Sequence, residues 1–320
     1  MTVLSRRTLL AGTAGSLSVT SCSRQLGEKP RVSILRAASY TADLFGLLRR
    51  ALLDHKVQVK DKSVLLKPNL VEFDPGTKIN TNPVLVQAAL EAFRSLGAAE
   101  VRIAEGPGHR RITLDLAEAA GYFQAISNFE DLFTDLNLDD VQLVKFRSPA
   151  SKLSSLYLPK MALKCDLLVS LPKMKTHHWV GATLSMKNLF GLVPGGVYGW
   201  PKNVLHWAGI NECVVDLYRA FANHFCIVDG IEGMEGNGPI QGTPKHAGVI
   251  VTGPDPVATD ATCCRIMGID PGKIDYLRRA STRGQTEATN VQQIGESIRN
   301  VAVPFELIPE FRHLRLAPLL

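Results

Sequence analysis

The sequence predicts an α/β fold with a mostly parallel sheet flanked by helices. Strand-like and helix-like segments alternate along the chain, and the strand-like segments are short apolar runs that stop at Pro, Gly or charged residues. Such runs are typical of buried strands, and their alternation with helices favours a parallel sheet covered on its faces. With 320 residues, 45% of them hydrophobic, the chain is long enough to bury a full core.

The first five predicted elements follow a β-α-β-α-β order. Residues 32–37 form the first strand, and residues 41–55 form a helix because Leu and Phe recur at helical spacing. Residues 63–69, "SVLLKPN", are an apolar run that ends at a proline, which predicts a buried strand. Residues 81–98 begin with polar residues and Pro and stop at Gly, as helices do. Residues 100–108 form a third strand that runs into a Gly-Pro-Gly turn.

The middle of the chain is less regular. We expect helices around 113–122 and short strands at 141–146 and 155–159. A division into two α/β lobes, with a boundary near 150–165, is an alternative to one domain. The further predicted elements are buried strands at 165–173, 224–230 and 246–253, a helix at 182–191, a long amphipathic helix at 204–223, and helices at 255–268, where Asp255 is the expected cap, and 270–282.

The amino terminus resembles an export signal. Arg6 and Arg7 precede a mild apolar run over 9–19, followed by V-T-S-C ending at Cys22. This run is too short to span a bilayer as a stable helix. The pattern resembles a twin-arginine signal ending in a lipobox, with lipidation at Cys22; a cleaved signal without a lipid, or an N-terminal tail, is the alternative.

This resemblance divides the chain into a signal over 1–21, a short tether over 22–30 and an α/β domain over 31–310. It implies export to the periplasm or another extracytoplasmic space, with the twin-arginine machinery as a partner. The only expected contact with the membrane is the lipid anchor.

Charge and cysteine content exclude some classes. The net charge is +6, and two of those charges lie in the expected signal. The remaining excess is small and forms no basic stripe with interleaved aromatics, so we expect no nucleic-acid partner. Apart from Cys22, the five cysteines show no CxxC or ferredoxin spacing. We therefore expect buried thiols and no iron–sulfur cluster.

Polar and charged residues follow the predicted strands where the apolar runs stop. Parallel sheets bind ligands at the carboxyl ends of their strands, so these residues are candidates for one site. Lysines there could hold a phosphate or carboxylate as point charges, whereas the alternative is that they extend over the sheet ends into water. The candidate binding residues are Lys67, Asn69, Lys173, Lys175, Thr176, Lys187, Asn188 and Gly236.

The acidic candidates lie in 229–244, a glycine-rich segment that predicts a loop. Asp229, Glu232 and Glu235 could bind a divalent metal through their carboxylates. Asp229 and Glu235 are also candidate general bases. The alternative is that Asp229 caps a turn and the two glutamates are solvated.

Two adjacent histidines follow the lysines. His177 is a candidate acid or base near neutral pH, and His178 is a weaker one. Adjacent side chains of an extended segment point to opposite faces, so the pair would chelate one ion poorly. The chain contains no HExxH, Walker A, GxSxG or Rossmann glycine motif, which removes support for four common mechanisms.

Together these segments resemble the family called domain of unknown function 362. The matching pieces are "LLKPNLV" (65–71), "TNPVLVQAALEAFRSLGA" (81–98), "DLLVSLPKMKTH" (166–177), "MKNLFGLVPG" (186–195), "DGIEGMEGNGPIQGTP" (229–244) and "DPVATDA" (255–261). The resemblance implies an α/β domain and no settled reaction. Many relatives carry a ferredoxin-like segment, which this chain lacks, so an iron–sulfur role does not carry over.

The leading hypothesis is an exported enzyme that acts on a small anionic substrate or cofactor. Lys67, Lys173 and Lys175 would hold the anion, and Asp229, Glu235 and His177 are the catalytic candidates. Redox chemistry on an organic cofactor and metal-assisted group transfer both remain open. The alternatives are a non-catalytic lipoprotein that binds an anion or metal-bound ligand, and an assembly factor.

Overall fold

The computed structural model describes residues 28–108 and 112–317. The expected signal over 1–21 and the expected lipidation site Cys22 lie outside the described residues. Of the helices in the described ranges, none has the length and apolar character needed to cross a membrane.

The main sheet has ten strands and mixed direction, with most pairings parallel. Its order along one path is β12-β1-β11-β10-β7-β2-β3-β4, and β8 pairs with β10 and β9 off this path. Only the contacts of β11 with β1 and β10, and of β9 with β8, are antiparallel. The strands are β1 Arg31–Arg36, β2 Ser63–Pro68, β3 Glu100–Glu105, β4 Phe133–Asp135, β7 Leu167–Leu171, β8 Lys173–His177, β9 Gly181–Thr183, β10 His224–Glu235, β11 Thr243–Gly253 and β12 Gln292–Gly295.

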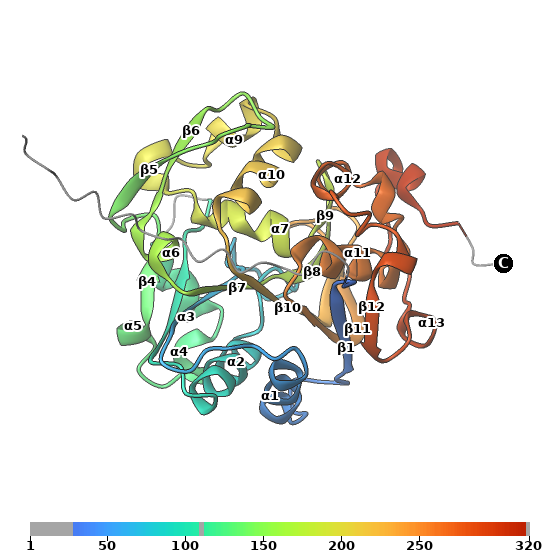
Figure 1. Cartoon of the computed structure of the whole chain (residues 1–320), viewed down its shortest axis with the longest axis horizontal. Coiled ribbons are helices and arrows are strands. Elements are labelled where there is room, and N and C mark those ends of the chain that lie inside the picture. Colours follow the sequence, from blue (N-terminus) through green and yellow to red (C-terminus); the bar gives the residue numbers. More distant parts are fainter. Residues whose placement is uncertain (1–27, 109–111, 318–320) are drawn as a thin grey trace, which may run out of the picture.

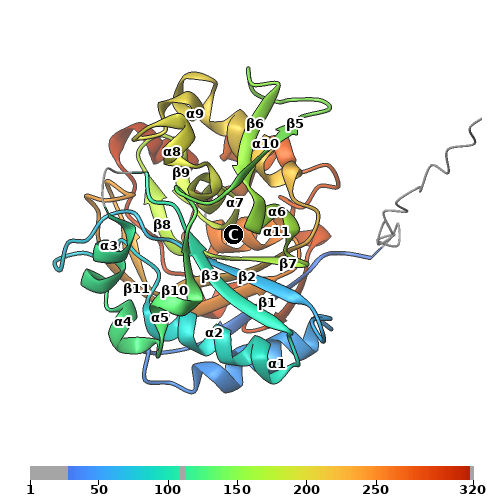
Figure 2. The ribbon, with the colours of Figure 1, turned by 90° about the vertical axis from the view of Figure 1, so that its left-hand side faces the viewer.

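Helices cover both faces of this sheet (Figures 1 and 2). Helices α1 and α2 lie on one face, and α7, α10 and α11 lie on the other. The side chains of β2 alternate between the two faces of the sheet. Val64 and Leu66 join the core beneath α1 and α2, whereas Leu65 joins the core on the opposite face. Successive side chains of a strand point to opposite faces, so an uninterrupted apolar run fits this three-layer arrangement. The predicted fold class is confirmed.

The helices vary in length, and a small antiparallel sheet lies apart from the main one. The α-helices are α1 Leu44–Asp54, α2 Pro83–Ser95, α3 Thr113–Ala119, α4 Tyr122–Ala125, α5 Phe129–Leu132, α6 Lys160–Lys164, α7 Ser185–Asn188, α8 Gly195–Tyr198, α9 Asn203–Trp207, α10 Ile210–Ala220, α11 Pro256–Ile266, α12 Asp275–Ala280 and α13 Ile298–Val301. The 3-10 helices are η1 Leu189–Leu192, η2 Pro271–Lys273, η3 Ala288–Asn290 and η4 Pro309–Leu314, and the small sheet pairs β5 Val141–Lys145 with β6 Ser155–Pro159.

Side-chain caps explain where the best-predicted helices begin. Asn82 accepts a hydrogen bond from the amide of Val84 at the start of α2, whose first residue is Pro83. Asp255 accepts from the amide of Ala258 at the start of α11. Such caps satisfy amides that have no partner inside the helix. The predicted capping role of Asp255 is confirmed.

Several sequence predictions are wrong in detail. The helix expected over 204–223 is two helices, α9 and α10, separated at Gly209, whose φ of 106° suits glycine. The helix expected over 182–191 is instead β9, the single turn α7 and η1. The loop expected over 229–244 is largely strand, because β10 continues to Glu235 and pairs with β11, which begins at Thr243.

The main sheet is forked after β7: β7 and β8 pair with successive parts of the same strand, β10, but β8 does not continue alongside β2. Strand β10 pairs in parallel first with β7, at Leu168 to Ser170, and then with β8, where Asp229 lies opposite Lys173. On the other side of β7, β2 stays paired as far as Pro68. The far edge of β8 pairs with the short strand β9 instead. The carboxyl ends of β2 and β3 therefore face β8 across a gap in the pairing, and the candidate site lies there.

Candidate functional site

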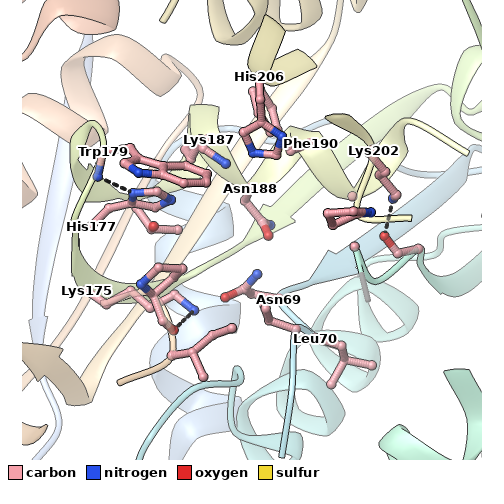
Figure 3. A pocket seen from close by; sticks show the side chains of 18 of the residues that line it. Asn69, Leu70, Lys175, His177, Trp179, Lys187, Asn188, Phe190, Lys202 and His206 are labelled. Atoms are coloured by element: carbon pink, nitrogen blue, oxygen red, sulfur yellow. Dashed lines mark hydrogen bonds between the residues drawn. The ribbon is translucent and has the colours of Figure 1, made fainter. Parts of the chain in front are cut away.

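A cavity of about 300 Å³ lies at the carboxyl edge of the parallel strands. Its walls come from the ends of β2 and β3, from β8 and the turn after it, and from α7, η1 and the start of α9. Figure 3 shows Lys175, Lys187 and Lys202 around this cavity, with His177 and Trp179 on one side. Some of the polar residues expected at the strand ends line this cavity, and others do not.

Lys175 is fully buried on β8. Its Nζ donates to the carbonyls of Ile79, at 2.9 Å, and Pro239, at 3.2 Å. It forms no ion pair with a carboxylate of the described residues. Burial lowers the pKa of Lys175 well below its ordinary value, and the nearby cations Lys173 and Lys187 lower it further.

Lys187 and Lys202 enter the cavity from different elements. The Nζ of Lys187, in α7, lies 3.6 Å from the ring centroid of Phe190, a cation–π distance. The Nζ of Lys202, at the start of α9, donates to the carbonyl of Gly106 at 2.5 Å. Burial, with a smaller contribution from neighbouring lysines, lowers the pKa of each lysine to about 7, and the Glu105 carboxylate opposes the shift of Lys202. Within the described ranges neither forms an ion pair.

A neutralised ion pair lies directly beneath the cavity. The Nζ of Lys67 donates to Glu105 Oε1 at 2.5 Å and to Asn188 Oδ1 at 3.2 Å, and both charged side chains are buried. Burial lowers the pKa of Lys67, while the Glu105 carboxylate acts in the opposite direction. Gly191 makes room for this pair, since a Cβ there would lie 2.5 Å from the Lys67 Nζ. Glu105 lines the cavity, but its charge is already compensated.

Asp229 belongs to a second buried network outside the cavity. It accepts from Lys173 Nζ at 2.6 Å, from the Tyr40 hydroxyl at 2.8 Å and from the Asn82 amide at 3.0 Å. Lys173 lines a separate hollow of about 300 Å³ beside residues 72–83. Burial lowers the pKa of Lys173 and the Asp229 carboxylate opposes this shift. Three donors already bind Asp229, so this carboxylate is held as a structural counter-ion.

The two adjacent histidines both line the cavity. The segment is not extended through both histidines, because β8 ends at His177 and the chain turns there, which leaves the ring centroids 5.1 Å apart. His177 Nδ1 accepts from the Trp179 amide at 3.0 Å, and His178 Nδ1 lies 2.7 Å from the Gly238 carbonyl. Burial lowers the pKa of His177 well below its ordinary value, and Lys187 adds to this, so the ring is neutral at pH 7.

The three acidic residues proposed as metal ligands do not converge. Glu232 pairs with His246 at 2.8 Å, and Glu235 pairs with Lys245 at 3.0 Å, while Asp229 is held by Lys173. In the described part of the chain no group of three or more His, Cys, Asp or Glu side chains is placed to hold a metal ion. The metal-site expectation for Asp229, Glu232 and Glu235 is therefore corrected: the segment is a strand that spaces these residues along its length.

The candidate residues thus divide into two groups. Asn69, Lys175, His177, Lys187 and Asn188 line the cavity. Those that do not line it are Lys67, Lys173, Asp229, Glu232, Glu235, Thr176 and Gly236.

Thr176 and Gly236 contribute to structure instead. The Thr176 hydroxyl donates to the Gly236 carbonyl at 2.8 Å and ties β8 to the β10–β11 hairpin. Gly236 has a φ of 77°, a conformation that glycine adopts without strain.

Sequence reasoning missed several cavity residues, namely Glu105, Trp179, Phe190, Lys202 and His206. The position of Glu105 at the end of β3 was a usable signal. Lys202 follows Pro201 outside any strand and has a φ of 63°, so no periodic pattern marked it. Trp179, His206 and Phe190 lie in a turn and in short helices, where sequence spacing says little about direction.

These features define an α/β protein with a lysine-lined cavity at the carboxyl edge of a parallel sheet. Residues 64–265 match the family described as a domain of unknown function, DUF362, and the chain belongs to that family. The thylakoid-associated protein sll1697 of Synechocystis sp. is 31% identical over 266 residues, which cover 77% of each chain.

A solved structure, the lactate racemase apoprotein from Thermoanaerobacterium thermosaccharolyticum, is similar at 15% identity with a TM-score of 0.41. The match covers 68% of this chain and 54% of that one, so this chain spans about half the length of that structure.

Proposed function

We propose that this protein is an enzyme that acts on a small anionic substrate or cofactor, bearing phosphate or carboxylate, bound in the lysine-lined cavity. The observation that carries the proposal is the excess of unpaired cations. Lys175, Lys187 and Lys202 line one cavity, and no carboxylate within the described residues forms an ion pair with them. Among the described residues, Glu105 is the one acidic residue that lines the cavity, and it is paired with Lys67.

The physical argument rests on cost. A buried ammonium without a counter-ion is unfavourable, and three around one cavity repel each other as well. The lowered pKa values of these lysines record that cost. A bound anion would supply the missing charge and raise the lysine pKa values again. Two histidines beside the lysines favour an enzyme over a simple binder, since a neutral imidazole can exchange protons with a bound ligand.

Anion binding tests the proposal directly. Isothermal titration with pyrophosphate and with oxalate, at pH 6 and low salt, should show saturable binding. Lys187→Met and Lys202→Met should each weaken binding by roughly tenfold or more, because each removes a charge-assisted contact. Lys152→Met is the matched control, since Lys152 is exposed and lies outside the cavity.

Two results would contradict the proposal: no binding of either anion, or binding that both cavity variants leave unchanged. Native mass measurement of purified protein adds a second arm, because a retained anion would identify the ligand class. Saturable binding without turnover of that ligand would instead favour the non-catalytic alternative.

Location at a membrane surface is part of the proposal. The signal-like sequence before residue 22 and the lipobox cysteine Cys22 support export and lipid anchoring. The thylakoid-associated relative is compatible with a membrane-surface location. Metabolic labelling with palmitate tests the anchor: wild type should incorporate the label and Cys22→Ala should not. Label in both variants, or in neither, would count against lipidation at Cys22.

A further inference from the structure

The two adjacent histidines are fixed by the backbone in opposite states. The Trp179 amide approaches His177 Nδ1 at 3.0 Å, and an amide N–H can only donate. His177 Nδ1 therefore carries no proton. A neutral imidazole bears one proton, so the proton of His177 is on Nε2 and this atom is a donor.

His178 has the reverse arrangement. Its Nδ1 lies 2.7 Å from the Gly238 carbonyl, and a carbonyl oxygen can only accept. His178 Nδ1 therefore carries the proton and, in the neutral ring, Nε2 presents a lone pair. Within the described residues, neither Nε2 atom has a protein partner, although His177 is buried and both residues line the cavity.

We infer that His177 and His178 form a donor–acceptor pair for the ligand, and that the ligand is an oxyanion that still carries a proton. His177 Nε2–H donates to one ligand oxygen, and His178 Nε2 accepts the ligand O–H. This inference rests on the proposed anion site and adds a selectivity that lysines alone cannot provide. Lysines attract any anion, whereas an acceptor lone pair is repelled by an oxygen without a proton.

The same pair defines a proton-transfer step. When the ligand O–H bond breaks and His178 Nε2 takes the proton, the His178 ring becomes imidazolium and the ligand gains one negative charge. The lysines that surround the cavity stabilise that added charge. His178 is thus the general base that accepts the ligand proton, and His177 donates a hydrogen bond to the ligand.

Hydrogen phosphate and sulfate provide a matched test at pH 8. Both are tetrahedral dianions of similar size, and only hydrogen phosphate carries an O–H. Neutral imidazole dominates at this pH. Wild type should bind phosphate at least about tenfold more tightly than sulfate, because an unmade hydrogen bond inside a buried site is costly. His178→Leu should bind the two equally, whereas His177→Leu should weaken both and keep their ratio.

Imidazole ¹⁵N NMR of the ligand-free wild-type chain provides a second measurement that needs no variant to fold. It should show His177 protonated at Nε2 and His178 protonated at Nδ1.

Equal affinity of wild type for phosphate and sulfate, both dependent on Lys187 and Lys202, would overturn the inference and leave the proposed anion site standing. A phosphate preference that survives His178→Leu, or reversed tautomers in the NMR spectrum, would also overturn it. Absence of binding by both anions at pH 8, together with absence of anion binding at pH 6, would remove the proposed site itself.

Discussion

Two sets of lysines, all buried except the half-buried Lys187, lie within the same part of the molecule and differ in one respect. Lys67 and Lys173 each contact a buried carboxylate, Glu105 at 2.5 Å and Asp229 at 2.6 Å. Lys175, Lys187 and Lys202 contact backbone carbonyls or an aromatic ring, and form no ion pair within the described ranges. We call the first set the paired lysines and the second the unpaired lysines.

The comparison teaches that burial alone does not mark a functional cation. A paired lysine has its counter-ion inside the fold, so its removal should harm folding. An unpaired lysine lacks one, so its removal should harm ligand binding more than folding. The four predictions below test this division, from the largest expected effect to the smallest.

Lys67→Met should be the most damaging substitution. It leaves the Glu105 carboxylate buried without its cation, which typically costs about 3–5 kcal/mol of unfolding free energy. Lys67→Met with Glu105→Leu should recover much of that loss, because neither charge then remains buried. Urea denaturation measures both variants, and a single variant as stable as wild type would break the comparison.

Lys202→Met should behave in the opposite way. It removes an uncompensated buried ammonium and one hydrogen bond to Gly106. Because these two effects oppose each other, the unfolding free energy of the ligand-free protein should change by no more than about 1 kcal/mol. The same denaturation experiment applies, and a loss as large as that of Lys67→Met would place Lys202 with the paired lysines.

The pH dependence of stability should report the unpaired lysines. Lys187 and Lys202 have folded-state pKa values of about 7, below the ordinary value of 10.5. Between pH 7 and 10.5 the unfolded chain therefore holds more protons than the folded chain. The free energy of unfolding should rise with pH across this window, by at most about 1.4 kcal/mol per pH unit for each lysine.

The matched comparison for this prediction is Lys202→Met, which should show a smaller slope in denaturation of ligand-free protein at pH 7, 8 and 9. Whereas the free energy of unfolding should rise with pH, anion affinity should fall as pH rises through 7, because the lysines lose their charge. Equal slopes in wild type and variant would contradict the assignment of the lowered pKa to Lys202.

Asp260→Asn should have a modest effect on stability and tests how α7 is positioned. Asp260 accepts from the amides of Ser185 at 2.8 Å and Met186 at 2.9 Å, and so holds the turn that carries Lys187. Asparagine keeps one of the two oxygens, so the expected loss is about 1 kcal/mol. A several-fold loss of anion affinity should accompany it. Normal affinity would mean that Lys187 is positioned without this contact.

Burial also raises the pKa of Asp260 to about 7. Between pH 4 and 7 the folded state therefore holds the extra proton, and this group lowers stability as pH rises. That slope should disappear in Asp260→Asn, which distinguishes a role of the charge from a role of the side-chain shape.

Much of the fold was predictable because local signals agreed with tertiary structure. The run "SVLLKP" became β2, and Asn82 with Pro83 began α2. The carboxyl-edge rule also located the cavity through Lys175 and Lys187. The strand and helix signals are local in sequence, which is why they could be recognised without knowing the tertiary structure.

Other features depend on contacts between distant segments, which a sequence pattern does not encode. The pairing of Asp229 with Lys173 depends on the register that places these two residues opposite each other. The glycines of 229–244 suggested a loop, yet β11 supplies the partner that keeps β10 extended. Lys202 reaches the cavity from an irregular segment and had no pattern to mark it.

The forked sheet has a consequence for folding order. Strand β10 holds both β7 and β8, so Lys175 is positioned only after a segment some fifty residues further along the chain has paired with it. Contacts of this range form late, because the intervening loop must close first. A chain shortened before residue 224 lacks β10 altogether and should bind no anion. Anion binding should therefore require a chain that extends at least through β10.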